Sequence, residues 1–246
     1  MVSDEAPARI ESTLALATVL AAVTGFVDAH VYLHVARVFV ANQSGNVVLF
    51  GIAVGEGRWA TVVAHIVAIT MFAVGVALGT TVHHRRTASG RELRPDLVLL
   101  VETAMLLVML VLLAAFDPEP DARPGVLDDV VLAIGALAMG LQTVVIGRVG
   151  SVAVATTYES GAVARVGEET AIAARGARTG DERGRHLFAV KVLVAVIACY
   201  AAGAALAAAA GEAPVWLLGP VVVALACSFP IRRLADRASR QVRGDD

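Results

Sequence analysis

A few ionisable and amide side chains interrupt long apolar stretches, and they are the first candidates for chemistry. Asp28 lies within an otherwise uncharged run. A charged acid at the centre of a membrane helix costs at least about 2.5 kcal/mol on insertion scales, so we expect Asp28 to face the protein interior. Thr24, Gly25 and Tyr32 share its helical face. Asp28 could bind a proton, a cation or a substrate, or it could tie a nearby backbone in place; Asn46 is a candidate partner in either case.

Glu102 and Gln142 are polar side chains in two later apolar runs. Glu102 has mainly apolar residues around it on its helix, so it could relay a proton, as Asp28 could, or serve as a structural partner. Gln142 is displaced by one residue from the position that an internal repeat would relate to Asp28. It could contact a substrate beside the acid, or form a hydrogen bond between helices.

Two Ser-Gly pairs, Ser44-Gly45 and Ser160-Gly161, lie inside the two most polar of the apolar runs. We expect each serine to cap the N-terminus of a short half-helix, because a hydroxyl can accept a hydrogen bond from a backbone N–H one turn further on. If both N-termini face a shared cavity, their partial positive charge would favour an anion or a polar solute. Ordinary capping of a kinked helix is the alternative. Thr157, in the same polar string as Ser160, completes the candidate substrate-binding set.

The sequence offers little support for a metal site, a bound cofactor or nucleic-acid binding. His30 and His34 are spaced as two metal ligands on one helical face, but Asp28 lies well round the helix from them, so we expect no metal site. Fingerprints of serine hydrolases, zinc proteases, P-loop proteins and dinucleotide binders are absent from the sequence, so we expect neither a cofactor nor an enzyme. The net charge is −2, and basic residues with interleaved aromatics do not form a groove, which argues against nucleic acid.

The composition indicates which kind of fold must position these residues. Hydrophobic residues make up 57% of the 246 residues before the 22 glycines are added, whereas soluble domains have roughly 45 to 50% with glycine included. Six apolar runs meet or approach the length of about 20 residues needed to cross a bilayer. They are Ser12–Ala36, Trp59–Val82, Leu97–Phe116, Val130–Gly147, Leu187–Gly211 and Ala213–Ile231. We predict an all-α polytopic membrane protein with about six transmembrane helices.

Arginine-rich connections predict which ends of these helices face the cytoplasm. The loop His83–Arg94, the stretch Arg165–Arg185 and the tail 233–246 all carry several arginines. The loop Asp117–Asp129 carries five acids against Arg123 alone and is predicted to lie outside. The tail is then cytoplasmic, and we take the N-terminus to be cytoplasmic as well, a condition on which the threading of the remaining segments depends.

Two further runs, Val38–Gly55 and Val149–Ala164, contain polar strings at their centres. With the loops placed as above, the first begins and ends outside, and the second begins and ends inside. Each is therefore predicted to be a re-entrant or broken segment, an extended leg followed by a half-helix, tolerated at membrane depth because protein or a wet cavity surrounds it. Eight full spans would place an arginine-rich segment on the wrong side.

A weak internal repeat agrees with this threading. Gly25 lies 20 residues before Gly45, and Gly140 lies 21 before Gly161. Later in each half comes Gly-x-Ala-Leu, starting at Gly75 and at Gly203. We therefore divide the single integral domain 1–246 into a first repeat, 12–116, and a second, 127–232, followed by the basic tail 233–246. Two halves of opposite topology form a 3+3 inverted repeat, a plan common in secondary transporters.

Four motifs in this order and spacing resemble the YoaK family of predicted bacterial membrane proteins, a domain-of-unknown-function family. They are Gly25-Phe26-Val27-Asp28-Ala29, Ser44-Gly45-Asn46, Ala138-Met139-Gly140-Leu141-Gln142 and Thr156-Thr157-Tyr158-Glu159-Ser160-Gly161. The resemblance covers nearly the whole chain and implies a six-helix inner-membrane protein without naming a substrate. Ser44 and Ser160 stand where the family has Thr, Thr143 where it has Asn, and Glu159 is an acid where an apolar residue is usual.

Together these patterns predict a multi-pass protein of the bacterial inner, or plasma, membrane. Its function is expected to be transport or conduction of a small polar or ionic solute through a site between the two half-helices. A structural or signalling membrane protein is the alternative, and a membrane-embedded enzyme is a weaker one. The expected partners are the lipid bilayer, the solute and a second copy of the chain in a homo-oligomer.

Overall fold

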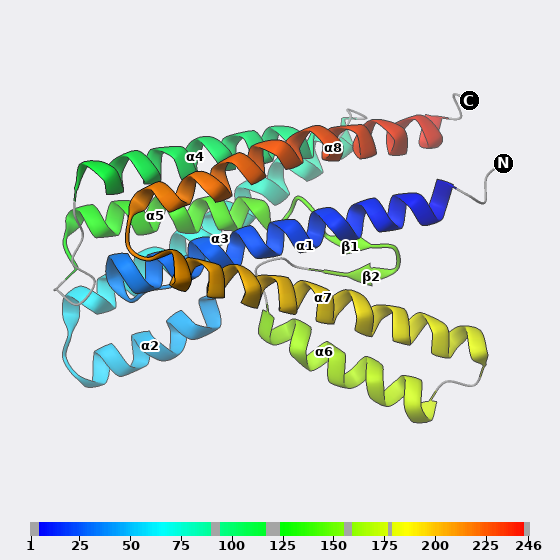
Figure 1. Ribbon diagram of the computed structural model, residues 1–246, viewed down its shortest axis with the longest axis horizontal. Coiled ribbons are helices and arrows are strands. Elements are labelled where there is room, and N and C mark those ends of the chain that lie inside the picture. Colours follow the sequence, from blue (N-terminus) through cyan, green and yellow to red (C-terminus); the bar gives the residue numbers. More distant parts are fainter. Residues whose placement is uncertain (1–4, 90–93, 117–123, 155–158, 177–178, 244–246) are drawn as a thin grey trace.

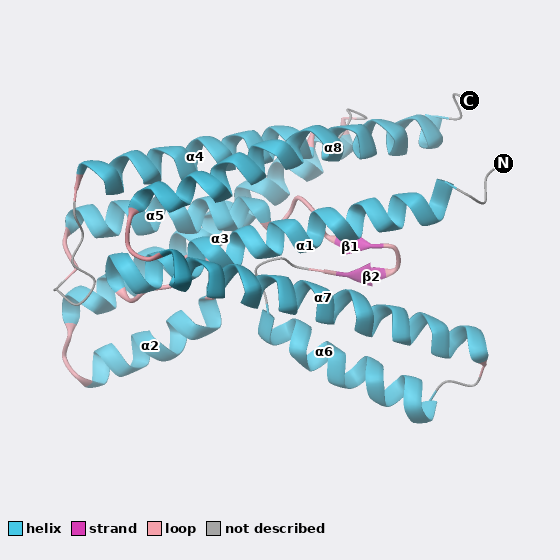
Figure 2. Cartoon of the chain, viewed as in Figure 1, coloured by secondary structure: helices cyan, strands magenta, loops and turns pink. Residues whose placement is uncertain are grey.

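Long apolar helices form most of the structure, because a backbone surrounded by lipid must satisfy its hydrogen bonds internally. The computed structural model describes residues 5–89, 94–116, 124–154, 159–176 and 179–243, and within these ranges one short β-hairpin interrupts the helices (Figure 2). The longer helices are α1 (Glu5–Val31), α3 (Trp59–Ala88), α4 (Pro95–Ala115), α5 (Val126–Gln142), α7 (Gly180–Ala210) and α8 (Leu218–Arg243). The shorter elements are α2 (Gln43–Gly55), β1 (Arg148–Val149), β2 (Val152–Ala153) and α6 (Glu159–Ala171). Single helical turns cover Tyr32–Ala36, Ile172–Gly176 and Pro214–Leu217.

Five helices are long and apolar enough to cross a membrane: Arg9–Ala36, Trp59–Arg86, Pro95–Ala115, Gly180–Ala210 and Pro214–Leu234. They correspond to five of the six predicted runs, and the expectation of a helical polytopic membrane protein is confirmed at this level. The sixth run, Val130–Gly147, is not one helix, because α5 has 17 residues and ends at Gln142. The apolar residues beyond Gln142 enter a turn and a hairpin that pack inside the protein, so their apolarity reflects burial and not a continued helix.

The half-helices α2 and α6 are each 13 residues long. At about 1.5 Å per residue each extends about 20 Å, less than the roughly 30 Å of the hydrocarbon layer. Figure 1 shows both helices starting near the middle of the long axis of the molecule and running toward opposite ends. Each follows a non-helical leg, as predicted for Val38–Gly55 and Val149–Ala164.

Connections gather at two ends of the molecule. The start of α1, the end of α3, the start of α4, the start of α7 and the end of α8 lie at one end in Figure 1. The joints between α2 and α3 and between α7 and α8 lie at the other end, with the end of α4 and the start of α5. All the described parts of the predicted cytoplasmic segments therefore share one end.

Four glycines allow two pairs of helices to approach closely, α1 with α7 and α3 with α5. A Cβ atom on any of them would overlap the backbone carbonyl oxygen of the facing helix. The contacts are Gly25 to Tyr200, Gly203 to Ala22, Gly75 to Leu137 and Gly140 to Phe72. In every case the carbonyl belongs to the residue three before the partner glycine. These are four of the six glycines that define the two predicted halves in the sequence.

Each non-helical leg is buried in one of two apolar clusters. Val38, Val40 and Ala41 of the first leg pack with residues of α1, α4 and α5. Val149 and Val152 of the hairpin pack with residues of α1, α7 and α8. Protein therefore surrounds both irregular segments, which is the condition for non-helical backbone at membrane depth.

Candidate functional site

The carboxylate of Asp28 binds the non-helical leg that precedes α2. Its Oδ1 accepts hydrogen bonds from the backbone N–H groups of Val40, at 2.6 Å, and Ala41, at 2.8 Å. Its Oδ2 accepts from the N–H of Asn42 at 3.1 Å and from the Tyr200 hydroxyl of α7 at 2.5 Å. The side chain is 1% exposed. Asp28 therefore joins α1, the leg and α7 through four hydrogen bonds.

Asn46, in the first turn of α2, also binds this leg. Its Oδ1 accepts from the N–H of Phe39 at 2.9 Å, and its Nδ2 donates to the carbonyl of Phe39 at 2.6 Å. Nδ2 also donates to Oε1 of Gln43, and Nδ1 of His65 on α3 lies 3.3 Å from Oδ1. We expected Asn46 to be a partner of Asp28, but the two side chains do not bind each other. Both form hydrogen bonds to backbone groups of residues 39–42 instead.

The leg needs these two side chains because it has no regular backbone pairing. Arg37 adopts a left-handed conformation, with φ of 52°, which ends the first helix and turns the chain back. Buried backbone N–H and C=O groups that lose their partners cost free energy, and neither helix nor sheet supplies partners here. Asp28, Asn46 and Gln43 supply them instead. Of the two roles considered for Asp28, the observed contacts are those of the backbone tie.

The helix α2 is capped by Asn42, not by Ser44. The Oδ1 of Asn42 accepts from the N–H of Gly45 at 3.1 Å and from the Ser44 hydroxyl at 2.9 Å. Ser44 lies inside the first turn, because the helix already begins at Gln43. Gly45 packs edge-on against the ring of Phe39, where a Cβ atom would be crowded. The prediction of Ser44 as the cap is therefore wrong by two residues.

The second half satisfies its leg in a different way. β1 and β2 pair with each other, with Arg148 opposite Ala153, and the N–H of Val154 donates to the carbonyl of Gly147 at 3.1 Å. The helix α6 begins at Glu159, one residue before Ser160, so Ser160 is not its cap. Gly161 lies in the first turn and is half-buried. Thr157 and the side chain of Ser160 lie outside what the structure describes.

Gln142 extends the polar region around Asp28 along α1. It lies at the end of α5, where its Nε2 donates to the hydroxyl of Thr24 at 2.9 Å and to the carbonyl of Leu20 at 3.1 Å. Thr24 is one helical turn from Asp28, and all three side chains are buried. We call Thr24, Asp28, Gln142 and Tyr200 the polar strip. The hydrogen bond between helices that was considered for Gln142 is therefore present.

Glu102 and the two histidines of α1 lie apart from the polar strip. Glu102 is fully buried on α4, which packs against α5 and α8. The rings of His30, on α1, and His34, in the turn that follows it, are tilted against each other with 5.0 Å between their centroids. Among the described residues, groups of three or more side chains that could hold a metal ion are not found.

Three contributors to these contacts were missed in the sequence. Tyr200 is one of several aromatic residues in the apolar runs, and its residue type alone does not distinguish it. His65 was detectable in principle, as a polar residue in the middle of an apolar run. Arg165 donates to the carbonyl of Ala153 and lies near Glu169, so it holds the hairpin against α6.

Comparisons with known proteins show a family without an assigned activity and a transmembrane relative. A sequence model of the family described as "Protein of unknown function (DUF1275)" matches residues 16–231. UPF0700 transmembrane protein YoaK of Bacillus subtilis (strain 168) is 28% identical over 154 residues. The aligned region covers 63% of this chain and 65% of that relative. No solved structure matches the chain significantly.

Proposed function

Because the chain belongs to the DUF1275 family of membrane proteins, whose description assigns no activity, we propose from its geometry that it transports or conducts a small polar solute across the bacterial inner membrane. The observation that carries this proposal is the pair of half-helices that start near the middle of the long axis of the molecule and run toward opposite ends (Figure 1). Broken helices of this kind place backbone and polar side chains at the midplane, where transporters bind their substrates.

The proposal includes a 3+3 inverted repeat that relates α1, α2, α3 and α4 to α5, α6, α7 and α8. Helix contacts support it, since each pair of neighbours has a counterpart. The contact of α1 with α7 corresponds to that of α5 with α3, α2 with α3 corresponds to α6 with α7, and α4 with α5 corresponds to α8 with α1. The four glycine contacts support it further, because they have the same spacing in both crossings.

The solute pathway in this proposal follows the polar strip, between α1, α5 and α7. Its electrostatics favour a neutral polar or cationic solute over an anion. The N-terminus of α2 would attract an anion by itself. Asp28, however, already accepts the N–H groups that lead into α2, and Asn42 accepts that of Gly45. An added anion would face the Asp28 carboxylate at close range.

Membrane orientation follows in the proposal from the arginine-rich segments, which share one end of the molecule and are taken as cytoplasmic. Single cysteines in a Cys199→Ala, Cys227→Ala background test this arrangement. We expect Glu56→Cys, after α2, to react with an impermeant thiol reagent in intact cells, as does the outer control Gly125→Cys. Glu168→Cys, on α6, should react only after permeabilisation, as does the inner control Ser89→Cys. All four positions are exposed.

Labelling of Glu56→Cys and Glu168→Cys from the same side would contradict the inverted arrangement. Labelling of Glu56→Cys only from the side of Ser89→Cys would show that α3, which lies between these two positions, does not cross the bilayer. Either result would remove the basis for a pathway between two half-helices.

A ligand screen tests whether the protein binds a solute, which transport requires. A solute that binds only the folded protein raises its stability by about 2.7 kcal/mol at a concentration of 100 Kd. We expect neutral polar or cationic solutes to raise the melting temperature of the purified protein in detergent. The shift should disappear in Gln142→Leu and persist in Gly51→Ala, which adds a methyl group where the structure leaves open space. Stabilisation confined to anions would refute the proposed solute class.

A structural or signalling protein remains the second candidate, and one observation favours it. Both oxygens of Asp28 are occupied by hydrogen bonds from the protein. A scaffold of this kind would bind no solute in the screen and would unfold when Asp28 is changed. A homo-oligomer is compatible with either function.

A further inference from the structure

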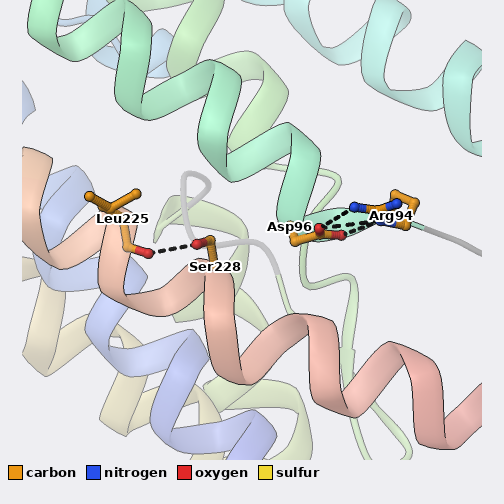
Figure 3. Close-up of polar contacts among 4 residues, drawn as sticks. All are labelled: Arg94, Asp96, Leu225 and Ser228. Atoms are coloured by element: carbon orange, nitrogen blue, oxygen red, sulfur yellow. Dashed lines mark hydrogen bonds and ion pairs between the residues drawn. The ribbon is translucent and has the colours of Figure 1, made fainter.

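Three acids are buried in the part of the chain that the structure describes: Asp28, Asp96 and Glu102. Asp28 accepts four hydrogen bonds. Asp96, at the start of α4, forms an ion pair with Arg94, whose Nη2 lies 2.8 Å from Oδ2 (Figure 3). Both oxygens of Glu102 are buried and have no hydrogen-bond partner among the described residues. Glu102 therefore differs in kind from the other two.

The surroundings of Glu102 are apolar. It is 0% exposed, and Leu99 and Leu106, one turn away on either side of it, are 0% and 1% exposed. From α8, Cys227 is near enough to interact with it electrostatically. The turn Pro214–Leu217, which also packs on α4, contains no titratable side chain. On α5 the acids are Asp128 and Asp129, in the first turn at the opposite end of the molecule.

The nearest charged groups along α4 are those of the Arg94 and Asp96 pair. Asp96 precedes Glu102 by six residues, which corresponds to about 9 Å of helix. Arg232, on α8, interacts with Asp96 and belongs to the same end. Figure 3 shows the pair on the α4 side of this region and Ser228 on the α8 side. No cation among the described residues forms an ion pair with Glu102.

An ionised carboxylate in such a place would lose its hydration without gaining a hydrogen bond or an ion pair, which is far more costly than burying the neutral acid. We propose that Glu102 is a proton-binding site between α4 and α8, occupied by a proton in this conformation and emptied when the interface opens. The ligand class is the proton itself. Its use in driving solute movement rests on the proposed transport function, whereas the binding site does not.

The location of Glu102 at the interface of α4 and α8 would allow its proton to exchange with water when these helices move apart. In the proposed repeat, α4 and α8 are counterparts that pack against each other, so a rocking of one half against the other would change this interface together with those of α1 with α7 and of α3 with α5. Cytoplasmic water would then approach along the polar groups at the end of α4 and α8, including Asp96 and Ser228. Ionisable residues inside membrane segments commonly serve as such relays.

A hydrophobic carbodiimide tests for the proton directly. Dicyclohexylcarbodiimide enters apolar regions and adds to a protonated acid: the acid proton moves to a carbodiimide nitrogen, and the carboxylate oxygen bonds to the central carbon. Migration of the acyl group to nitrogen then gives a stable N-acylurea, with no leaving group. We expect the full-length protein, purified in detergent, to carry this adduct on Glu102 and not on Asp28 or Asp96, as read by peptide mass spectrometry.

The adduct should be lost in Glu102→Gln, form more slowly as the pH rises, and fail to form with a water-soluble carbodiimide. Glu102→Gln should keep the melting temperature of the wild type, because the amide replaces a neutral acid of the same shape. Absence of the adduct would overturn the proposal. A large drop in melting temperature in Glu102→Gln would also overturn it, because it would indicate that the Glu102 carboxylate is ionised and paired with a positive charge.

These outcomes are separable from the transport proposal. An adduct on Glu102 together with a failed solute screen would leave the proton site standing and remove its coupling role. A successful solute screen without an adduct would keep transport and eliminate Glu102 as the proton site.

Discussion

Replacing Gly25 by alanine is expected to destabilise the protein by about 3 kcal/mol or more, the upper range for overpacking a close-packed core. The added Cβ would overlap the carbonyl group of Tyr200 on α7, which is backbone and cannot rotate away. The helices α1 and α7 would have to separate, and this would also pull Tyr200 from Asp28. Denaturant unfolding of the purified protein in mixed micelles measures the change.

Gly51→Ala is the matched control for this substitution. Gly51 is also a helical glycine, on α2, but a Cβ atom there meets nothing within 4 Å. Alanine is favoured over glycine in a helix by about 1 kcal/mol, so this variant should be equal to the wild type or slightly more stable. If the two variants unfold alike, the close crossing of α1 and α7 is wrong.

Asp28→Asn is expected to destabilise the protein by roughly 1 to 3 kcal/mol for each buried donor that loses its acceptor. The asparagine oxygen can still accept from two donors, but its NH2 group would face the N–H of Asn42 and the Tyr200 hydroxyl, which now point at Oδ2. Buried donors would be left without acceptors. The same denaturant unfolding measures the decrease in the free energy of unfolding, and size-exclusion profiles show whether the variant remains folded.

Tyr200→Phe removes only one of the four hydrogen bonds of Asp28 and serves as the graded control. A hydrogen bond to a charged group contributes about 1.5 to 3 kcal/mol, so its cost should be smaller than that of Asp28→Asn. A stable Asp28→Asn protein that has lost solute binding would instead assign Asp28 to the solute and not to the leg before α2.

The two non-helical legs could be located from the sequence, whereas their stabilising contacts could not. Polar strings within apolar runs and the arginine bias of the loops are local signals, and both are visible in one dimension. The first leg is bound by side chains of α1 and α2, and these are bound in turn by His65 of α3 and Tyr200 of α7, which is 172 residues from Asp28 in the chain. Tyr200 and His65 therefore could not be assigned to this site in advance.

The capping residue of α2 is another feature that the sequence alone did not predict correctly. Ser44 and Asn42 are both good capping residues. Which of them caps depends on where the helix begins, and that is decided by the hydrogen bonds of Asp28 and Asn46 to residues 39–42. The local pattern therefore gave the correct region but the wrong residue.

Length, composition and the distribution of charge determined that the chain is a helical membrane protein, because burial in lipid demands long apolar segments and confines charges to their ends. The spacing of its glycines also singled out four positions at which helices pack closely. Only the tertiary structure decided that these glycines meet as two close helix crossings, that Asp28 is bound by the leg before α2 and by Tyr200, and that Glu102 has no hydrogen-bond partner among the described residues. Hydrogen bonds and helix contacts join residues that are distant in the chain, and no local pattern specifies which polar groups will meet in a packed interior.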